Sequence, residues 1–95
     1  MSRYERIPTR RFRKDLRRLK RSGYDLKKLE NAIDVLASGK ELPASFQDHP
    51  LKGLLAGTRE CHIGPDWLLR YCKNNDRLIL ILISTGTHRI VLGIE

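Results

Sequence analysis

The chain has 95 residues, enough for one domain with a modest hydrophobic core and too few for a second, so we expect residues 1–95 to form a single domain. Its 19 Lys and Arg residues against 11 Asp and Glu residues give a formal net charge of +8, which favours phosphates or an acidic protein as partners. The longest apolar run, residues 78–83, is far too short to span a bilayer, no N-terminal signal is visible, and the two cysteines lack C-x-x-C spacing. We therefore expect a soluble cytoplasmic protein with reduced cysteines and no membrane contact.

The first third of the chain predicts a short strand followed by two helices. Residues 4–7 are typical of a strand, and Thr9 is a good N-cap for a helix that runs to about residue 22. The apolar stripe of this helix consists of Phe12, Leu16 and Leu19. Asp25 can cap a second helix that ends near residue 38. The short connection predicts an antiparallel helical hairpin that covers one side of a sheet.

Positive charge is concentrated on the first predicted helix. Ten of the Lys and Arg residues lie within residues 3–21, where only Glu5 and Asp15 oppose them. The preference for Arg suits forked contacts with phosphate or carboxylate, while a plainly solvated helix surface is the alternative. We call these residues of the helix the basic surface: Arg10, Arg11, Arg13, Lys14, Arg17, Arg18 and Arg21.

The second half of the chain predicts strands. Residues 39–57 are rich in Gly and Pro and predict mainly a loop. Strands are expected at 58–63, 67–73, 77–83 and 89–92. The third of these is apolar on both faces and so predicts a central strand with cover on both sides, and residues 85–88 predict a turn or bulge. The fold class is therefore α+β, with the helical hairpin, after a short first strand, packed on one face of a twisted, mainly antiparallel β-sheet.

The chain has three histidines, and each lies beside a predicted turn: His49, His62 and His88. Imidazole gives and takes protons near neutral pH. With Asp66 and a nearby Arg59, these groups suit metal-free RNA cleavage, in which a 2′-hydroxyl attacks the adjacent phosphate. A zinc site is the rival use of the same residues, although no H-E-x-x-H or C-x-x-C core supports it, and purely structural histidines are a third interpretation.

Three motifs, in order along the chain, resemble the YafQ-like branch of the RelE/ParE superfamily of bacterial toxins. They are D-H-P-L at 48–51, G-x-R-E-x-H-x-x-P-D-W at 57–67 and T-G-T-H at 85–88. The resemblance implies a RelE-like fold and a toxin of a type II toxin-antitoxin system. Such a toxin is a ribosome-dependent endoribonuclease that cuts messenger RNA in the A site of the 70S ribosome, without metal or cofactor, and a cognate acidic antitoxin silences it. The alternative is a ParE-like toxin or binding module that acts through its basic helix.

The resemblance also implies roles for single residues. We expect His88 to be the general acid, and Asp66 with His49 or His62 to provide the base and its orientation. The residues expected to contact substrate are Arg59, Trp67 and Leu92. Leu92 stands where the family has Phe, which predicts altered codon preference or weaker activity, and a strand Trp is often part of the core. The basic surface would meet ribosomal RNA or the antitoxin, with no direct DNA binding outside the antitoxin complex.

Overall fold

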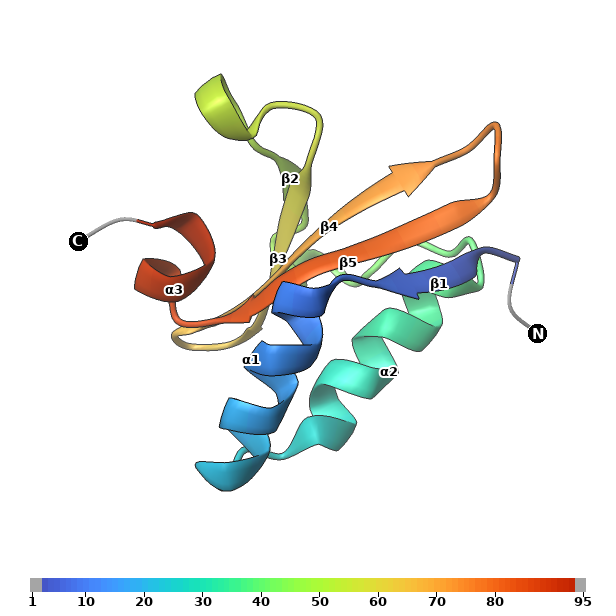
Figure 1. Cartoon of the computed structure of the whole chain (residues 1–95). Helices are drawn as coiled ribbons and strands as arrows, with labels where there is room; N and C mark the ends of the chain where they lie inside the picture. Colours follow the sequence, from blue (N-terminus) through green and yellow to red (C-terminus); the bar gives the residue numbers. More distant parts are fainter. Residues whose placement is uncertain (1–2, 94–95) are drawn as a thin grey trace.

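The computed structural model describes residues 3–93. In this part of the chain a five-stranded sheet, ordered β1-β5-β4-β3-β2, is joined by three α-helices (Figure 1). The elements are β1 (Glu5–Pro8), α1 (Arg10–Arg21), α2 (Leu26–Ala37), β2 (His49–Pro50), β3 (Arg59–Gly64), β4 (Trp67–Asn74), β5 (Ile79–Gly86) and α3 (His88–Leu92), with 3₁₀ turns at Ala44–Phe46 and Gly53–Leu55. Strand β1 is parallel to β5, and the other pairs are antiparallel. The predicted α+β fold class is confirmed.

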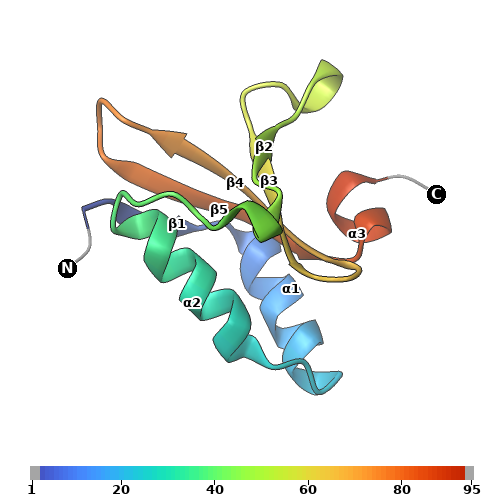
Figure 2. The ribbon, with the colours of Figure 1, turned by 180° about the vertical axis from the view of Figure 1, so that it is seen from behind.

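The predicted helical hairpin and both of its caps are confirmed. The Thr9 hydroxyl accepts a hydrogen bond from Phe12 N at 3.0 Å, and the Asp25 carboxylate accepts one from Lys27 N at 3.2 Å. Gly23 follows α1 with a φ of +80°, a left-handed conformation that glycine adopts without a Cβ penalty. Helices α1 and α2 lie next to each other on one side of the sheet, and α3 lies on the other side (Figures 1 and 2).

The hydrophobic core fills the space between the helical hairpin and the sheet. We call this side of the sheet the covered face, and its core residues from the strands include Cys61, Trp67, Leu69, Tyr71, Leu80 and Leu82. The alternating residues Glu60, His62, Leu68 and Arg70 belong to the opposite side, which we call the open face. Asp15 of α1 is also buried, and its Oδ2 accepts a hydrogen bond from Thr85 N at 3.1 Å. This bond ties the helix to the end of β5.

Residues 89–92 are helical, which corrects the predicted final strand. The β-branched residues Ile90 and Val91 favour a strand, but Leu68 and Gly86 form the last pair between β4 and β5, so no neighbouring strand continues beyond them. A helix forms instead, because the Thr87 hydroxyl caps it by accepting from Ile90 N at 3.3 Å.

Two further predictions for the sheet are correct only in part. The expected loop at residues 39–57 contains β2, which pairs with β3, as well as the two 3₁₀ turns. Strand β5 is an interior strand, as predicted, yet Ile79, Ile81 and Ile83 are only half-buried, so its first part is not covered on both sides. Among residues 3–93, no helix has the length and apolar character that crossing a membrane requires.

Candidate active site

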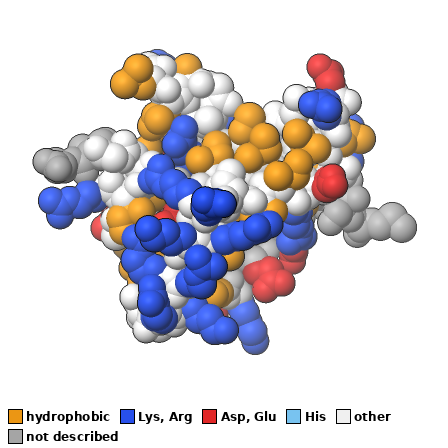
Figure 3. All heavy atoms as spheres, in the orientation of Figure 1, with side chains coloured by type: hydrophobic (Ala, Val, Ile, Leu, Met, Phe, Trp, Pro, Cys, Tyr) orange, Lys and Arg blue, Asp and Glu red, His pale blue; other side chains and the backbone are white. Residues whose placement is uncertain are grey.

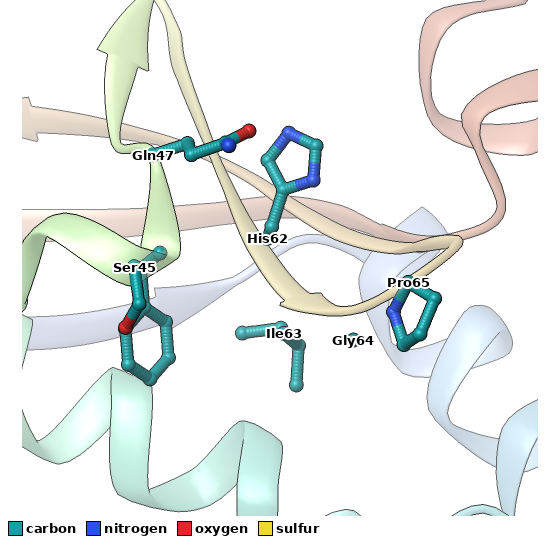
Figure 4. Close-up of a pocket in the computed structure, with 7 residues that line it drawn as sticks. Ser45, Gln47, His62, Ile63, Gly64 and Pro65 are labelled. Carbon is teal, nitrogen blue, oxygen red and sulfur yellow. The ribbon is translucent and has the colours of Figure 1, made fainter.

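Three segments that are far apart in the sequence bring the three histidines together. His49 comes from β2, His62 from β3 and His88 from the first residue of α3. The ring centroids of His49 and His62 are 6.5 Å apart, and those of His62 and His88 are 5.6 Å apart. His62 projects from one side of β3 and Ile63 from the other (Figure 4), as strand alternation predicts.

Asp66 holds His88 through one hydrogen bond to its ring and one to its backbone. Its Oδ1 lies 2.6 Å from His88 Nδ1 and accepts the backbone N–H of His88 at 3.1 Å. Because an ionised carboxylate only accepts, the short contact requires the proton on Nδ1 and leaves Nε2 for a substrate. The hydrogen bond from the His88 side chain, together with the one from its backbone, holds the pKa of Asp66 below its ordinary value.

Gly86 fixes the approach of α3 to the sheet and therefore the position of His88. Its φ is +149°, and a Cβ atom at this position would lie 3.3 Å from Ile90 Cγ2. Both the backbone conformation and the close packing exclude a larger residue without a shift of α3. The glycine of the T-G-T-H motif is thus explained by the placement of the histidine that follows it.

A buried carboxylate, Glu60, lies between the other two histidines. Its Oε1 is 3.3 Å from His49 Nε2 and 3.9 Å from His62 Nε2, and the residue is only 5% exposed. His49 Nδ1 lies 2.6 Å from the carbonyl oxygen of Gln47, which fixes that ring with its proton on Nδ1. The Glu60 Oε2 atom is buried and has no hydrogen-bond partner within the described part of the protein.

Glu60 is not among the site residues that the sequence predicts. The signal that was available is the strand period of two, which puts both residues on the open face. The approach of His49 depends on the pairing of His49 with Glu60, and a two-residue edge strand inside a Gly-rich and Pro-rich segment carries no clear sequence signal.

Arg59 lies on the covered face, away from the histidines, and its expected contact with substrate stays a prediction. It shares the face of Cys61, because residues two apart in a strand point the same way. Its Nε donates to Asp48 Oδ1 at 3.1 Å, and Tyr71 OH donates to the same oxygen at 2.6 Å. These three side chains line a hollow of about 590 Å³ near the end of α2, on the opposite side of the sheet from the histidines.

Trp67 is part of the core, which favours a structural role, and its expected contact with substrate stays a prediction. The residue is 6% exposed, its Nε1 donates to Thr85 Oγ1 at 3.0 Å, and its ring meets the Tyr24 ring edge-on with centroids 5.0 Å apart. A ring enclosed in this way leaves no free face on which an RNA base could stack in this structure. Leu92 is half-buried in α3, and its contact with substrate stays a prediction.

The basic surface lies on α1 and reaches α3. Its members are exposed except Arg18, which is half-buried and paired with Asp15. Lys and Arg side chains gather over α1 in the space-filling view (Figure 3). Arg11 donates from Nη2 to the carbonyl oxygen of Ile90 in α3, so the basic surface adjoins the helix that carries His88.

The histidines lie beside a hollow in the protein surface. A hollow of about 400 Å³ beside His62 is lined by Ser45, Phe46, Gln47, His62, Ile63, Gly64 and Pro65 (Figure 4). Within residues 3–93, no group of three or more His, Cys, Asp or Glu side chains is arranged to hold a metal ion. Both cysteines are free thiols, and burial raises the pKa of Cys61 to about 12.

Comparison with known proteins gives consistent matches over nearly the whole chain. A family model described as "Bacterial toxin of type II toxin-antitoxin system, YafQ" matches residues 4–93. The mRNA interferase toxin YafQ of Escherichia coli strain K12 is 37% identical over 83 residues, which cover 86% of this chain and 88% of that protein. A chain of the E. coli DinJ-YafQ complex superposes with a TM-score of 0.86 at 31% identity, covering 95% and 99% of the two chains. A metal-bound toxin from Helicobacter pylori superposes with a TM-score of 0.86 at 38% identity, covering 93% and 98%.

Proposed function

Because the chain belongs to the YafQ family of toxins from bacterial type II toxin-antitoxin systems, we propose that it is an endoribonuclease that cuts messenger RNA in the ribosomal A site. The observation that carries this proposal is the meeting of His49, His62 and His88 with two carboxylates, Asp66 and Glu60, on one face of the sheet. A group of imidazoles and carboxylates can supply both the acid and the base that RNA cleavage needs.

We assign the general acid to His88. Its Nδ1 proton is held by Asp66, so the acid is the imidazolium form of the ring, in which Nε2 carries the second proton and gives it to the 5′-oxygen that leaves. In this step the bond between phosphorus and the 5′-oxygen breaks as the bond from the 2′-oxygen to phosphorus forms. Asp66 acts on the reaction through the ring of His88, as its orienting partner.

We assign the general base to the group formed by Glu60, His49 and His62. The Glu60 carboxylate lies within 3.9 Å of both rings, so a proton taken from the 2′-hydroxyl by an imidazole gains a negative neighbour. The product of the step is a 2′,3′-cyclic phosphate and a free 5′-hydroxyl. Glu60 thus positions the two histidines and stabilises the proton that they accept.

The acid–base route that we propose uses the side chains of the protein and no metal ion. A relative from H. pylori is described as metal-bound. In residues 3–93 of this chain, no three His, Cys, Asp or Glu side chains are grouped so as to hold a metal ion, so the proposed route assigns the proton transfers to side chains. Cleavage should therefore persist in a chelator such as EDTA.

Two macromolecular partners follow from the proposed function. The basic surface suits the phosphates of ribosomal RNA, whose attraction is independent of sequence and weakens as salt is raised. It also suits a cognate acidic antitoxin that orders as it wraps around the toxin, as a relative of this chain occurs in a complex with DinJ. Competition for the same cations would explain silencing without any change in the active site.

The decisive experiment compares message cleavage on translating ribosomes by wild type and by His88→Ala. Loss of the general acid should slow cleavage by about 100-fold to 10,000-fold. The matched control is Arg77→Gln, in the exposed turn between β4 and β5, which should cleave at the wild-type rate. Equal rates for wild type and His88→Ala would remove His88 from the mechanism. Folded wild type that binds ribosomes without cleaving would favour the alternative, a non-nuclease toxin that acts through its basic surface.

A further inference from the structure

A site that cleaves a phosphodiester needs positive charge at the phosphate, and Arg59 points to the other face. On the open face, Arg70 of β4 lies directly across from Glu60 in β3 and from Ser84 in β5. Directly opposed residues of antiparallel strands point to the same side, with Cβ atoms about 4.5–5.5 Å apart. Arg70 therefore stands beside the carboxylate that lies between His49 and His62.

The side chain of Arg70 is hydrogen-bonded through Nε, which leaves its two Nη groups free to donate to a ligand. Its Nε donates to Thr58 Oγ1 at 3.1 Å, and Thr58 in turn donates to the carbonyl oxygen of Leu55 at 2.7 Å. None of the ion pairs within residues 3–93 includes Arg70, so no carboxylate of this region lies within 4.0 Å of it. The side chain is thus held in place through Nε, and both Nη groups remain for a ligand.

The surroundings of Arg70 favour an anion. Arg70 is half-buried, and burial together with the nearby charge of Arg11 lowers its pKa. Two neighbouring guanidinium groups repel each other, and an anion between them would relieve both this repulsion and the cost of desolvation. Arg11 belongs to the basic surface and also contacts α3, so this pair of cations connects the basic surface to the candidate active site.

The two cross-strand neighbours of Arg70 also lack partners. Glu60 Oε2 and Ser84 Oγ are the buried side-chain atoms within residues 3–93 that have no hydrogen-bond partner in the protein. Unpaired buried polar atoms are rare in folded proteins and require an explanation. A ribose phosphate matches the chemistry of this row, because a hydroxyl can donate to a carboxylate and anionic oxygens accept from a guanidinium.

We propose that Arg70 binds a non-bridging oxygen of the scissile phosphate and stabilises the negative charge that develops there as the 2′-oxygen attacks. The inference rests on the proposed nuclease function and assigns to Arg70 the role that the sequence suggested for Arg59. A guanidinium fixed at Nε offers two parallel N–H donors, which match two phosphate oxygens better than an ammonium does.

The first test measures single-turnover cleavage on programmed ribosomes at saturating toxin for wild type, Arg70→Gln and Arg70→Lys. Removal of one such donor typically costs about 100-fold to 1,000-fold in rate, so Arg70→Gln should be about 100-fold slower. Arg70→Lys keeps the charge without the fork and should be about 10-fold slower. Ribosome affinity should change by less than about 3-fold, because one cation among many is lost. Arg77→Gln is the charge-matched control and should behave as wild type.

The second test uses sulfur in place of each non-bridging oxygen of the scissile phosphate. Wild type should discriminate between the two diastereomers, and this discrimination should be lost in Arg70→Lys, a readout that a merely structural role would not move. If Arg70→Gln does not fold, wild type and Arg70→Lys still give this comparison. Wild-type cleavage with unchanged rates and unchanged discrimination in the folded variants would overturn the role of Arg70 alone. Absence of cleavage by wild type would overturn the nuclease function and the role of Arg70 together.

Discussion

The two faces of the sheet differ in whether their buried polar side chains have hydrogen-bond partners. On the covered face, Trp67 and Tyr71 donate hydrogen bonds at 3.0 Å and 2.6 Å, and Asp15 accepts one from the backbone of β5. On the open face, Glu60 Oε2 and Ser84 Oγ are buried without a partner. The same strands supply both faces, since alternate residues point to alternate sides. These polar groups of the covered face are thus paired within the protein, whereas two buried polar atoms of the open face are not.

The unpaired polar atoms of the open face lower the stability of the protein. A buried polar atom without a partner costs about 1–3 kcal/mol, which a protein optimised for stability alone would not retain. Such costs are typical of sites where activity and stability compete. Substitutions on the open face should then change activity far more than stability, and substitutions on the covered face should do the reverse.

Among the substitutions that test this contrast, the largest effect is expected for Glu60→Gln on the open face. Gln keeps the size of Glu but cannot stabilise a proton on His49 or His62, so cleavage should slow by about 100-fold. The free energy of unfolding should stay the same or rise, because a buried charge with an unpaired oxygen is removed. Single-turnover cleavage and urea unfolding measure the two quantities.

The matched control for this substitution is Glu30→Gln, on the exposed surface of α2, which should change neither quantity. If Glu60→Gln lowered stability by several kcal/mol and left the cleavage rate of the folded protein intact, Glu60 would be a structural residue. The contrast between the faces would then fail.

A smaller and opposite effect is expected for Trp67→Phe on the covered face. The variant loses the hydrogen bond to Thr85 and part of the buried ring, so the free energy of unfolding should fall by about 2 kcal/mol. Thr85 keeps its own hydrogen bond to the carbonyl oxygen of Leu68 at 2.8 Å, which limits the damage. Cleavage by the folded variant should stay within about 3-fold of wild type. A fully folded variant that cleaves much more slowly would instead indicate that Trp67 contacts a base of the RNA.

The smallest effect concerns the titration of Asp66 at the edge of the open face. The hydrogen bonds from His88 hold its pKa below the ordinary 3.8, so His88→Ala should move that pKa upward, as carboxyl NMR would record. A depressed pKa in the folded state stabilises the protein above the ordinary value and loses that contribution as pH falls through the depressed one. The difference in stability between wild type and His88→Ala should therefore shrink in acid. An unmoved Asp66 pKa would mean that the contact is not maintained in solution.

Local signals in the sequence predict most of the fold. The caps at Thr9 and Asp25 and the turns after β3 and β4 follow from residue type alone. Helix α3 does not follow from residue type, because Ile90 and Val91 favour a strand. A helix forms because the pairing of β4 with β5 ends at Leu68 and Gly86, so the residues of α3 have no strand to pair with. Its cap at Thr87 and its stop at Gly93, with a φ of +68°, are present in the sequence but belong to a helix of five residues.

The candidate site could be predicted by composition and not by geometry. The histidines and Asp66 stand out because of their residue types beside turns. Strand alternation alone places Arg59 on the face opposite to its neighbour Glu60, whereas the register between β3 and β4 is what places Arg70 directly across from Glu60. Register depends on contacts across the whole sheet, so a single sequence read in segments does not provide it.

The parallel pairing of β1 with β5 has a consequence for the synthesis of this protein. Strand β1 and the helical hairpin emerge from the ribosome before β5, the strand with which β1 pairs and against which α1 packs. Contacts between such distant segments form late in folding, because the intervening chain must first be closed into a loop. His88 lies beyond β5, so the three histidines can come together only after β5 has been synthesised and has joined the sheet.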